Sequence, residues 1–205
     1  MKLRKLFFAY LYGLFFHCLF AFDYDVRDVK SLEYLRFLHV HEQGADESCG
    51  LSVVSSILNL YLNHDVSEID LVSELSEELQ ISRRLTMAHM MKIFESYGYE
   101  TKAYKIDIEN FIKAVQNYAP VIVHYDKPEL HFVFVLKACQ NYVVVADPVL
   151  GVEMQTMEDF QKKWSKTILL IQMPEDTLNK TMIKSAIETA IQKHSLLERV
   201  AKRKW

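Results

Sequence analysis

Three residues that lie far apart in the sequence have the types needed for thiol-based catalysis: Cys49, His131 and Asp147. Apolar residues follow Cys49 at helical spacing as far as Leu62, which predicts an amphipathic helix that begins at the cysteine. The first turn of a helix has unpaired N–H groups and the positive end of the helix dipole, and both favour a thiolate. Cys49 is therefore a candidate nucleophile, and a small core residue is the alternative interpretation.

The histidine and the aspartate lie at the open end of a predicted β-hairpin. His131 begins one apolar run, Asp147 ends the next, and Gln140 and Asn141 form the predicted turn between them. The hairpin brings the start of the first strand close to the end of the second, so His131 and Asp147 become neighbours. The order Cys, His, Asp then matches a nucleophile, a base and a carboxylate that orients the base.

Several short segments resemble the C39 family of cysteine peptidases. Gln-x5-Cys-Gly at positions 43–50 resembles the active-site signature of that family. His-Phe-Val-Phe-Val-Leu from position 131 and Ala-Asp-Pro at positions 146–148 resemble its histidine and aspartate motifs. The likeness covers roughly residues 29–173. Residues 31–37 also resemble stand-alone exported members, including those associated with bacterial functional-amyloid secretion.

The resemblance implies an α+β, papain-like fold, with the nucleophile at a helix N-terminus in a helical subdomain and an antiparallel sheet after it. It implies that Cys49 is the nucleophile, His131 the base, Asp147 the orienting residue and Gln43 a donor to the oxyanion. Family members often cut leaders after a Gly-Gly pair, many as the N-terminal domain of a peptide-exporting ABC transporter. These 205 residues include no ATPase or multi-span region, so we expect neither transport nor ATP binding.

The order of the predicted elements favours an α+β fold on its own, because helices come first and strands second. Sequence patterns predict helices over residues 49–62, 67–79, 87–97, 108–117 and 156–163, and strands over residues 99–105, 121–125, 131–136, 142–146 and 166–173. His124 competes with His131 as the base, but it ends a strand and its hairpin partner is not an aspartate. We interpret it as a structural or substrate-side residue.

The two ends of the chain differ in character from the middle. Three cations in the first five residues precede an apolar stretch over residues 6–21, which predicts an export signal or an uncleaved membrane anchor over residues 1–22. The expected peptidase domain spans residues 23–174. We therefore expect export across the inner membrane to the periplasm, with membrane anchoring as an open alternative.

The tail, residues 175–205, is predicted to be a basic amphipathic helix with seven basic and four acidic residues. It either packs on the domain or docks on a secretion-system partner or an anionic membrane surface. The formal net charge is −3, and without the three N-terminal cations it is −6, from 21 basic and 27 acidic residues. This acidic body argues against nucleic acid as a partner.

No cofactor or metal is expected, and the lack of any Cys-x-x-Cys spacing argues against a structural zinc site. His39 and His41 are interpreted as polar edge residues of a strand rather than metal ligands. A disulfide between Cys49 and Cys139 is not expected, since it would consume the nucleophile.

The predicted function is cysteine peptidase activity on an exported protein or leader. Two alternatives stay open at this stage. A transglutaminase-like acyl transferase has the same order of residues, and a non-cleaving peptide-binding module of a secretion system would use the same fold.

Overall fold

The computed structural model describes residues 32–44, 48–74 and 85–203. These residues belong to one compact unit, Leu32–Trp205, and residues 1–31 form a second unit outside the description. The predicted export signal and the end of the predicted helix 67–79 therefore lie outside the described residues. No described helix is both long enough and apolar enough to cross a membrane.

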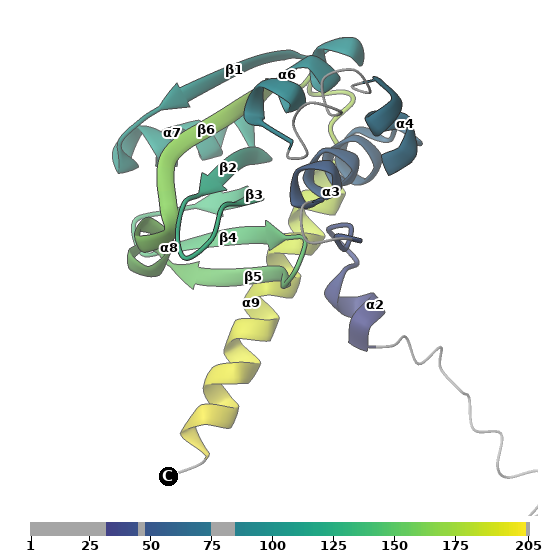
Figure 1. Cartoon of the computed structure of the whole chain (residues 1–205). Helices are drawn as coiled ribbons and strands as arrows, with labels where there is room; N and C mark the ends of the chain where they lie inside the picture. Colours follow the sequence, from purple (N-terminus) through teal and green to yellow (C-terminus); the bar gives the residue numbers. More distant parts are fainter. Residues whose placement is uncertain (1–31, 45–47, 75–84, 204–205) are drawn as a thin grey trace, which may run out of the picture. The chain divides into compact units, whose positions relative to one another are not determined.

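A six-stranded antiparallel sheet forms the centre of this unit, with the strand order β1-β6-β2-β3-β4-β5 (Figure 1). The five strands predicted over residues 99–173 are all present. One strand was missed, β5, because its polar residues and its glycine start resemble a turn in the sequence. The strands are β1 Glu100–Lys105, β2 Val121–Tyr125, β3 His131–Ala138, β4 Tyr142–Asp147, β5 Gly151–Thr156 and β6 Trp164–Gln172.

The helices begin at the polar capping residues that the sequence offers. The side chains of Thr86, Asp107 and Thr156 each accept a hydrogen bond from the backbone N–H three residues later. The helices are α2 Leu32–Arg36, α3 Cys49–Ser56, η1 Ile57–Tyr61 (a π-helical continuation of α3), α4 Glu68–Glu74, α6 Met87–Ser96, α7 Ile108–Tyr118, α8 Met157–Lys163 and α9 Lys180–Lys202.

Alternating strand residues divide the core between the two faces of the sheet. On one face Phe134 and its neighbours pack with residues of α3, η1, α6 and α9. On the other face α7 and α8 cover the sheet, and the Phe111 ring lies 4.9 Å from the Phe160 ring and 4.6 Å from the Trp164 ring. Helices α2 to α6 precede the antiparallel sheet in the sequence, and α3 packs against β3, which agrees with the predicted α+β class.

The first half of α9 is part of the core rather than a solvated tail. Ala186 and Ala190 are fully buried. The backbone N–H of Asn179, the helix cap, donates to the carbonyl of Tyr61 at the end of η1 over 2.8 Å. Deleting residues 175–205 would therefore expose the core, so a truncation that tests docking alone has to be made further along α9.

His39 and His41 do not lie on a strand edge as predicted, because the described residues between α2 and α3, which are 37–44 and 48, include no strand. His39 is 2% exposed, and its ring nitrogens lie 3.2 Å from Met182 Sδ and 3.2 Å from Thr189 Oγ1 on α9. His41 Nδ1 lies 3.0 Å from Ser55 Oγ on α3. His39 therefore attaches the segment before α3 to α9, and His41 attaches it to α3. Both helices were predicted, but local sequence patterns do not reveal these contacts.

Substitution of Gly151 by alanine is expected to destabilise the protein strongly. Gly151 has φ +77°, and a Cβ would lie 2.3 Å from the backbone oxygen of Arg36 at the end of α2. Gly98 is the matched control, because its φ is +84° but a Cβ there would meet nothing within 4 Å. We expect Gly98→Ala to cost about 1–2 kcal/mol and Gly151→Ala to cost about 1–3 kcal/mol more. Urea unfolding measures both, and equal losses would contradict the predicted backbone clash.

Candidate active site

Cys49 is the first residue of α3, as predicted. The first turn of the helix is formed by the backbone hydrogen bond from the Ser52 N–H to the Ser48 carbonyl, over 3.0 Å. Cys49 is half-buried, and the next residue, Gly50, is buried. A Cβ at Gly50 would lie 2.8 Å from side-chain atoms of Leu85 and of Met90 on α6. Glycine after the cysteine therefore lets the start of α3 approach α6 closely.

His131 and Asp147 lie together at the open end of the β3–β4 hairpin. The distance between His131 Nε2 and Asp147 Oδ1 is 2.9 Å. Asp147 is 4% exposed, and the same oxygen accepts from the backbone N–H of Val149 over 2.8 Å and of Leu150 over 3.3 Å. The turn after β4 therefore holds the carboxylate in place facing the imidazole. The hairpin argument placed these two residues as the structure does.

The ionisation of the three side chains is coupled. Burial alone would raise the pKa of the Cys49 thiol, but hydrogen bonds with the His131 ring and with the backbone of Phe132 outweigh it and lower that pKa. Burial alone would lower the pKa of His131, but its hydrogen bonds with Asp147 and Cys49 raise it to about 9. Burial opposes ionisation of Asp147, yet its bond with His131 keeps its pKa below the ordinary value. Both shifts favour transfer of the thiol proton to the imidazole, which gives a thiolate beside an imidazolium.

Gln43 is hydrogen-bonded through its backbone to the turn that follows β4, at the end of the sheet where Asp147 lies. Its backbone N–H donates to the carbonyl of Pro148, the residue after Asp147, over 3.1 Å. The side-chain Oε1 of Gln43 is buried and has no hydrogen-bond partner among the described residues. The segment that carries Gln43 is thus tied to the turn that holds Asp147, while its side-chain oxygen is left without a protein donor. Residues 45–47, between Gln43 and the helix, lie outside the description.

His124 lies near His131, but within the described part of the chain no carboxylate is hydrogen-bonded to its ring, and Asp126 acts on it only through its charge. Its Nδ1 is 3.3 Å from Ser165 Oγ, and its ring lies 4.9 Å from the Phe132 ring. Burial lowers its pKa. Sequence reasoning missed Tyr125, which pairs with His131 across β2 and β3 and places its ring 6.5 Å from the imidazole. Its position at the end of β2, opposite the start of β3, was the available signal.

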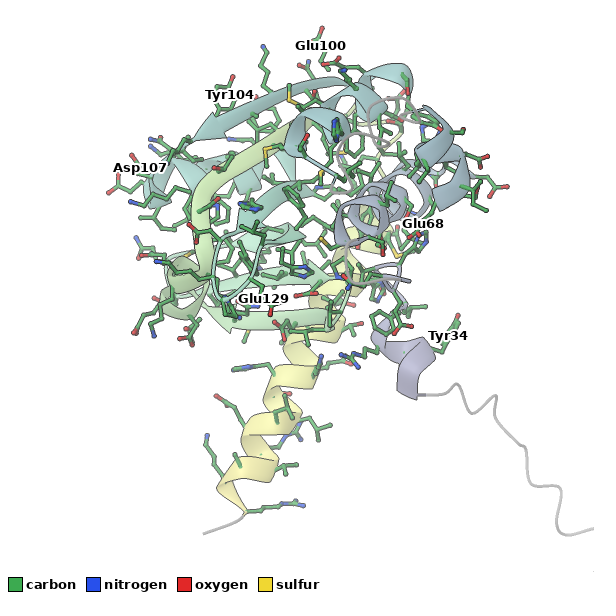
Figure 2. The ribbon with its side chains drawn as sticks, in the orientation of Figure 1. Tyr34, Glu68, Glu100, Tyr104, Asp107 and Glu129 are labelled. Atoms are coloured by element: carbon green, nitrogen blue, oxygen red, sulfur yellow. The ribbon has the colours of Figure 1, made fainter. Side chains whose placement is uncertain are left out.

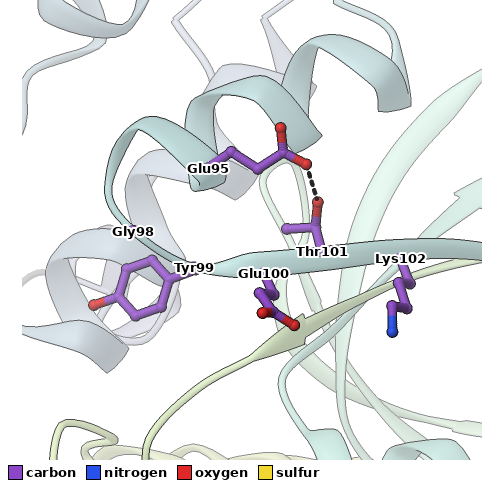
Figure 3. A pocket seen from close by; sticks show the side chains of 6 residues that line it. All are labelled: Glu95, Gly98, Tyr99, Glu100, Thr101 and Lys102. Atoms are coloured by element: carbon purple, nitrogen blue, oxygen red, sulfur yellow. Dashed lines mark hydrogen bonds between the residues drawn. The ribbon is translucent and has the colours of Figure 1, made fainter.

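Other features of the described residues lie apart from this site. Cys139 lies beside the hairpin turn. Cys49 and Cys139 are both free cysteines, so they do not form a disulfide with each other. Among the described residues no three potential ligands are grouped to hold a metal ion. A surface pocket of about 400 Å³ opens where α6 meets β1 (Figure 3), and a hydrogen bond of 3.3 Å from Thr101 Oγ1 to Glu95 Oε1 crosses it. That pocket borders the edge strand, away from Cys49.

Solved structures share this fold. One is the peptidase domain of Streptococcus ComA, described as a bifunctional ABC transporter involved in quorum sensing. It matches with a TM-score of 0.56 and 21% identity, over 66% of this chain and 98% of that one. A double-glycine-motif protease from an AMS/PCAT transporter, solved with the leader peptide, matches with a TM-score of 0.52 and 21% identity, over 66% and 91%. The papain-like peptidase fold is confirmed.

The family model for the peptidase C39 family matches residues 38–176, and this chain belongs to that family. Two curated relatives, each described as a probable functional amyloid protease FapD, come from Pseudomonas fluorescens and Pseudomonas aeruginosa. They are 27% and 25% identical over 150 residues, which is 71% of this chain. The match spans 65% of the length of each relative. The resemblance read from the motifs is confirmed at the level of the family.

The reactivity of Cys49 with iodoacetamide is expected to stay high well below the ordinary thiol pKa of about 8.5. The reason is that His131 lowers the pKa of the thiol. In His131→Ala the alkylation rate should fall at neutral pH and recover only as the pH rises toward that ordinary value. Mass spectrometry gives the rate at each pH, with Cys139 labelling as the internal reference. Identical pH profiles in both proteins would show that no activated pair exists.

Proposed function

We propose that this protein is a cysteine peptidase that cleaves a peptide bond with Cys49 as nucleophile and His131 as base. The observation that carries the proposal is a connected set of side chains. Cys49 at a helix N-terminus is hydrogen-bonded to His131, which in turn lies 2.9 Å from a buried Asp147. Membership of a peptidase family supports the same reading.

In the proposed mechanism the Cys49 thiolate attacks the carbonyl carbon of the substrate. The backbone N–H of Cys49 and the side-chain amide of Gln43 donate to the oxyanion that develops. The His131 imidazolium protonates the leaving amine, which leaves a thioester on Cys49. Neutral His131 then takes a proton from a water molecule as that water attacks the thioester carbonyl. The carboxylic acid product leaves, and Cys49 is restored. Asp147 keeps the imidazole oriented throughout.

The proposed substrate is an exported protein or its leader, met in the periplasm. Two observations support this choice. The N-terminal cations and apolar stretch have the form of an export signal. The relatives with curated descriptions are named as probable functional amyloid proteases, and one solved relative was captured with a leader peptide. An extended, accessible linker is the segment that the proposed peptidase site would accept.

Product analysis with a defined peptide mixture tests the proposal. The full chain and Cys49→Ala are incubated with the mixture and a fluorescent primary amine, and products are sequenced by mass spectrometry. Peptidase activity predicts new N- and C-termini that require Cys49. Incorporated amine without new termini would instead indicate a transglutaminase-like acyl transferase, and bound but unchanged peptides would indicate a binding module.

A further inference from the structure

The second half of α9 continues the buried face of its first half beyond the body of the protein. Ala186 and Ala190 are fully buried, and the next positions on the same face, at helical spacing, are Lys193, Leu197 and Val200. Leu197 is 59% exposed and Val200 is 49% exposed. Figure 1 shows this half of α9 extending past β5. An apolar stripe thus runs off the core with no described residue covering it.

The turn between β4 and β5 adds an exposed apolar side chain next to this stripe and links the stripe to α2. Lys193 Nζ lies 3.5 Å from the carbonyl of Leu150, in the turn between β4 and β5. Arg36 of α2 donates to the same carbonyl over 3.2 Å. The turn is therefore the junction between α2 and α9. Leu150 is 40% exposed, whereas Tyr34, which is 48% exposed, lies on the side of α2 away from α9 in Figure 2.

The charge around the stripe is positive although the chain as a whole is negative. Residues 191–203 carry four cations, Lys193, Arg199, Lys202 and Arg203, and one anion, Glu198. Two side chains lie close to the Glu198 carboxylate: His194 Nε2 is 3.5 Å and Lys202 Nζ is 3.9 Å from its oxygens. A short apolar stripe with a basic flank suits the boundary of a membrane with anionic headgroups.

From this arrangement we propose that the distal half of α9, with α2 and the turn at residues 149–150, binds an anionic lipid surface. A second copy of the chain fits less well, because pairing the stripes would bring the cationic flanks of both copies together. The short link between α2 and the N-terminal apolar stretch also supports a lipid surface. Ten residues, 22–31, separate α2 from the apolar stretch at residues 6–21, and they reach at most about 35 Å. The proposal does not rest on the peptidase activity.

Vesicle sedimentation tests the proposal with the full chain. Vesicles of phosphatidylcholine alone measure any binding by the N-terminal apolar stretch, and vesicles with added phosphatidylglycerol measure the gain from anionic lipid. We expect R199Q/K202Q/R203Q to lose most of that gain, on the order of tenfold to a hundredfold in partition coefficient. L197Q/V200Q should lose binding as well. The matched control K102Q/K105Q/K113Q changes the net charge equally through exposed lysines of β1 and α7 and should retain the gain.

Three outcomes would overturn the proposal. The first is equal binding of the unmodified protein to both kinds of vesicle. The second is an equal loss in the control variant, which would reflect net charge alone. The third is a dimer in lipid-free sedimentation that L197Q/V200Q dissociates, which would assign the stripe to a second copy. Circular dichroism establishes that each variant is folded, and hydrolysis of a soluble peptide should be unchanged, since these residues lie outside the candidate active site.

Discussion

Replacement of Cys49 by alanine is expected to lower kcat/KM for peptide hydrolysis by about 10⁴-fold or more, to the level of the uncatalysed background. The thiolate is the only group in the proposed mechanism that forms a bond to the substrate. His131 and Gln43 act through the intermediate that this bond creates, so they contribute little without it. Initial rates on a peptide that the unmodified protein cleaves give the measurement.

Cys139→Ala is the matched control for this experiment. Both cysteines are free and half-buried, and Cys139 lies beside the hairpin turn at the opposite end of β3 from His131. We expect the Cys139 variant to keep its activity within about twofold and both variants to unfold within about 1 kcal/mol of the parent. Retained hydrolysis in Cys49→Ala would place the nucleophile elsewhere and remove the proposed mechanism.

Replacement of Asp147 by alanine is expected to damage stability and activity together. The variant leaves three donors without their acceptor at a site that is 4% exposed: His131 Nε2 and the N–H groups of Val149 and Leu150. We expect a loss of about 3 kcal/mol in the free energy of unfolding. Without its partner the imidazole also loses its orientation, so kcat should fall by about 10²–10⁴-fold.

Asp147→Asn separates the two roles of this carboxylate, because asparagine keeps an oxygen that can accept the same hydrogen bonds. It should recover most of the stability and part of kcat. The native pKa of Asp147 lies below the ordinary value of an aspartate. Its stabilising effect is therefore present above the ordinary aspartate pKa of about 3.9 and is lost as the pH falls through the native pKa. The gap in urea stability between the parent and Asp147→Ala should narrow in that acid range. A gap that does not change with pH would show that the carboxylate charge contributes nothing.

Local patterns in the sequence were enough to predict Cys49, His131 and Asp147 as candidate catalytic residues, whereas Gln43 was predicted through the resemblance to the C39 family. The start of α3 at Cys49 follows from apolar periodicity. The approach of His131 to Asp147 follows from a hairpin whose two strands and turn are contiguous in the chain. Each inference needs contacts only between residues close in sequence, together with one general rule about helix ends or hairpins. The helix caps at Thr86, Asp107 and Thr156 are local in the same sense.

Tertiary structure alone decided where the remaining segments pack. His39 contacts Thr189 across 150 positions, and Arg36 contacts Leu150 across 114. Such contacts depend on which faces meet after folding, and no local periodicity encodes that choice. The division of α9 into a buried half and an exposed half has the same origin. The residues on this face of α9 have the same helical spacing along the whole helix. Burial ends near Lys193 because α9 extends beyond the rest of the fold from there.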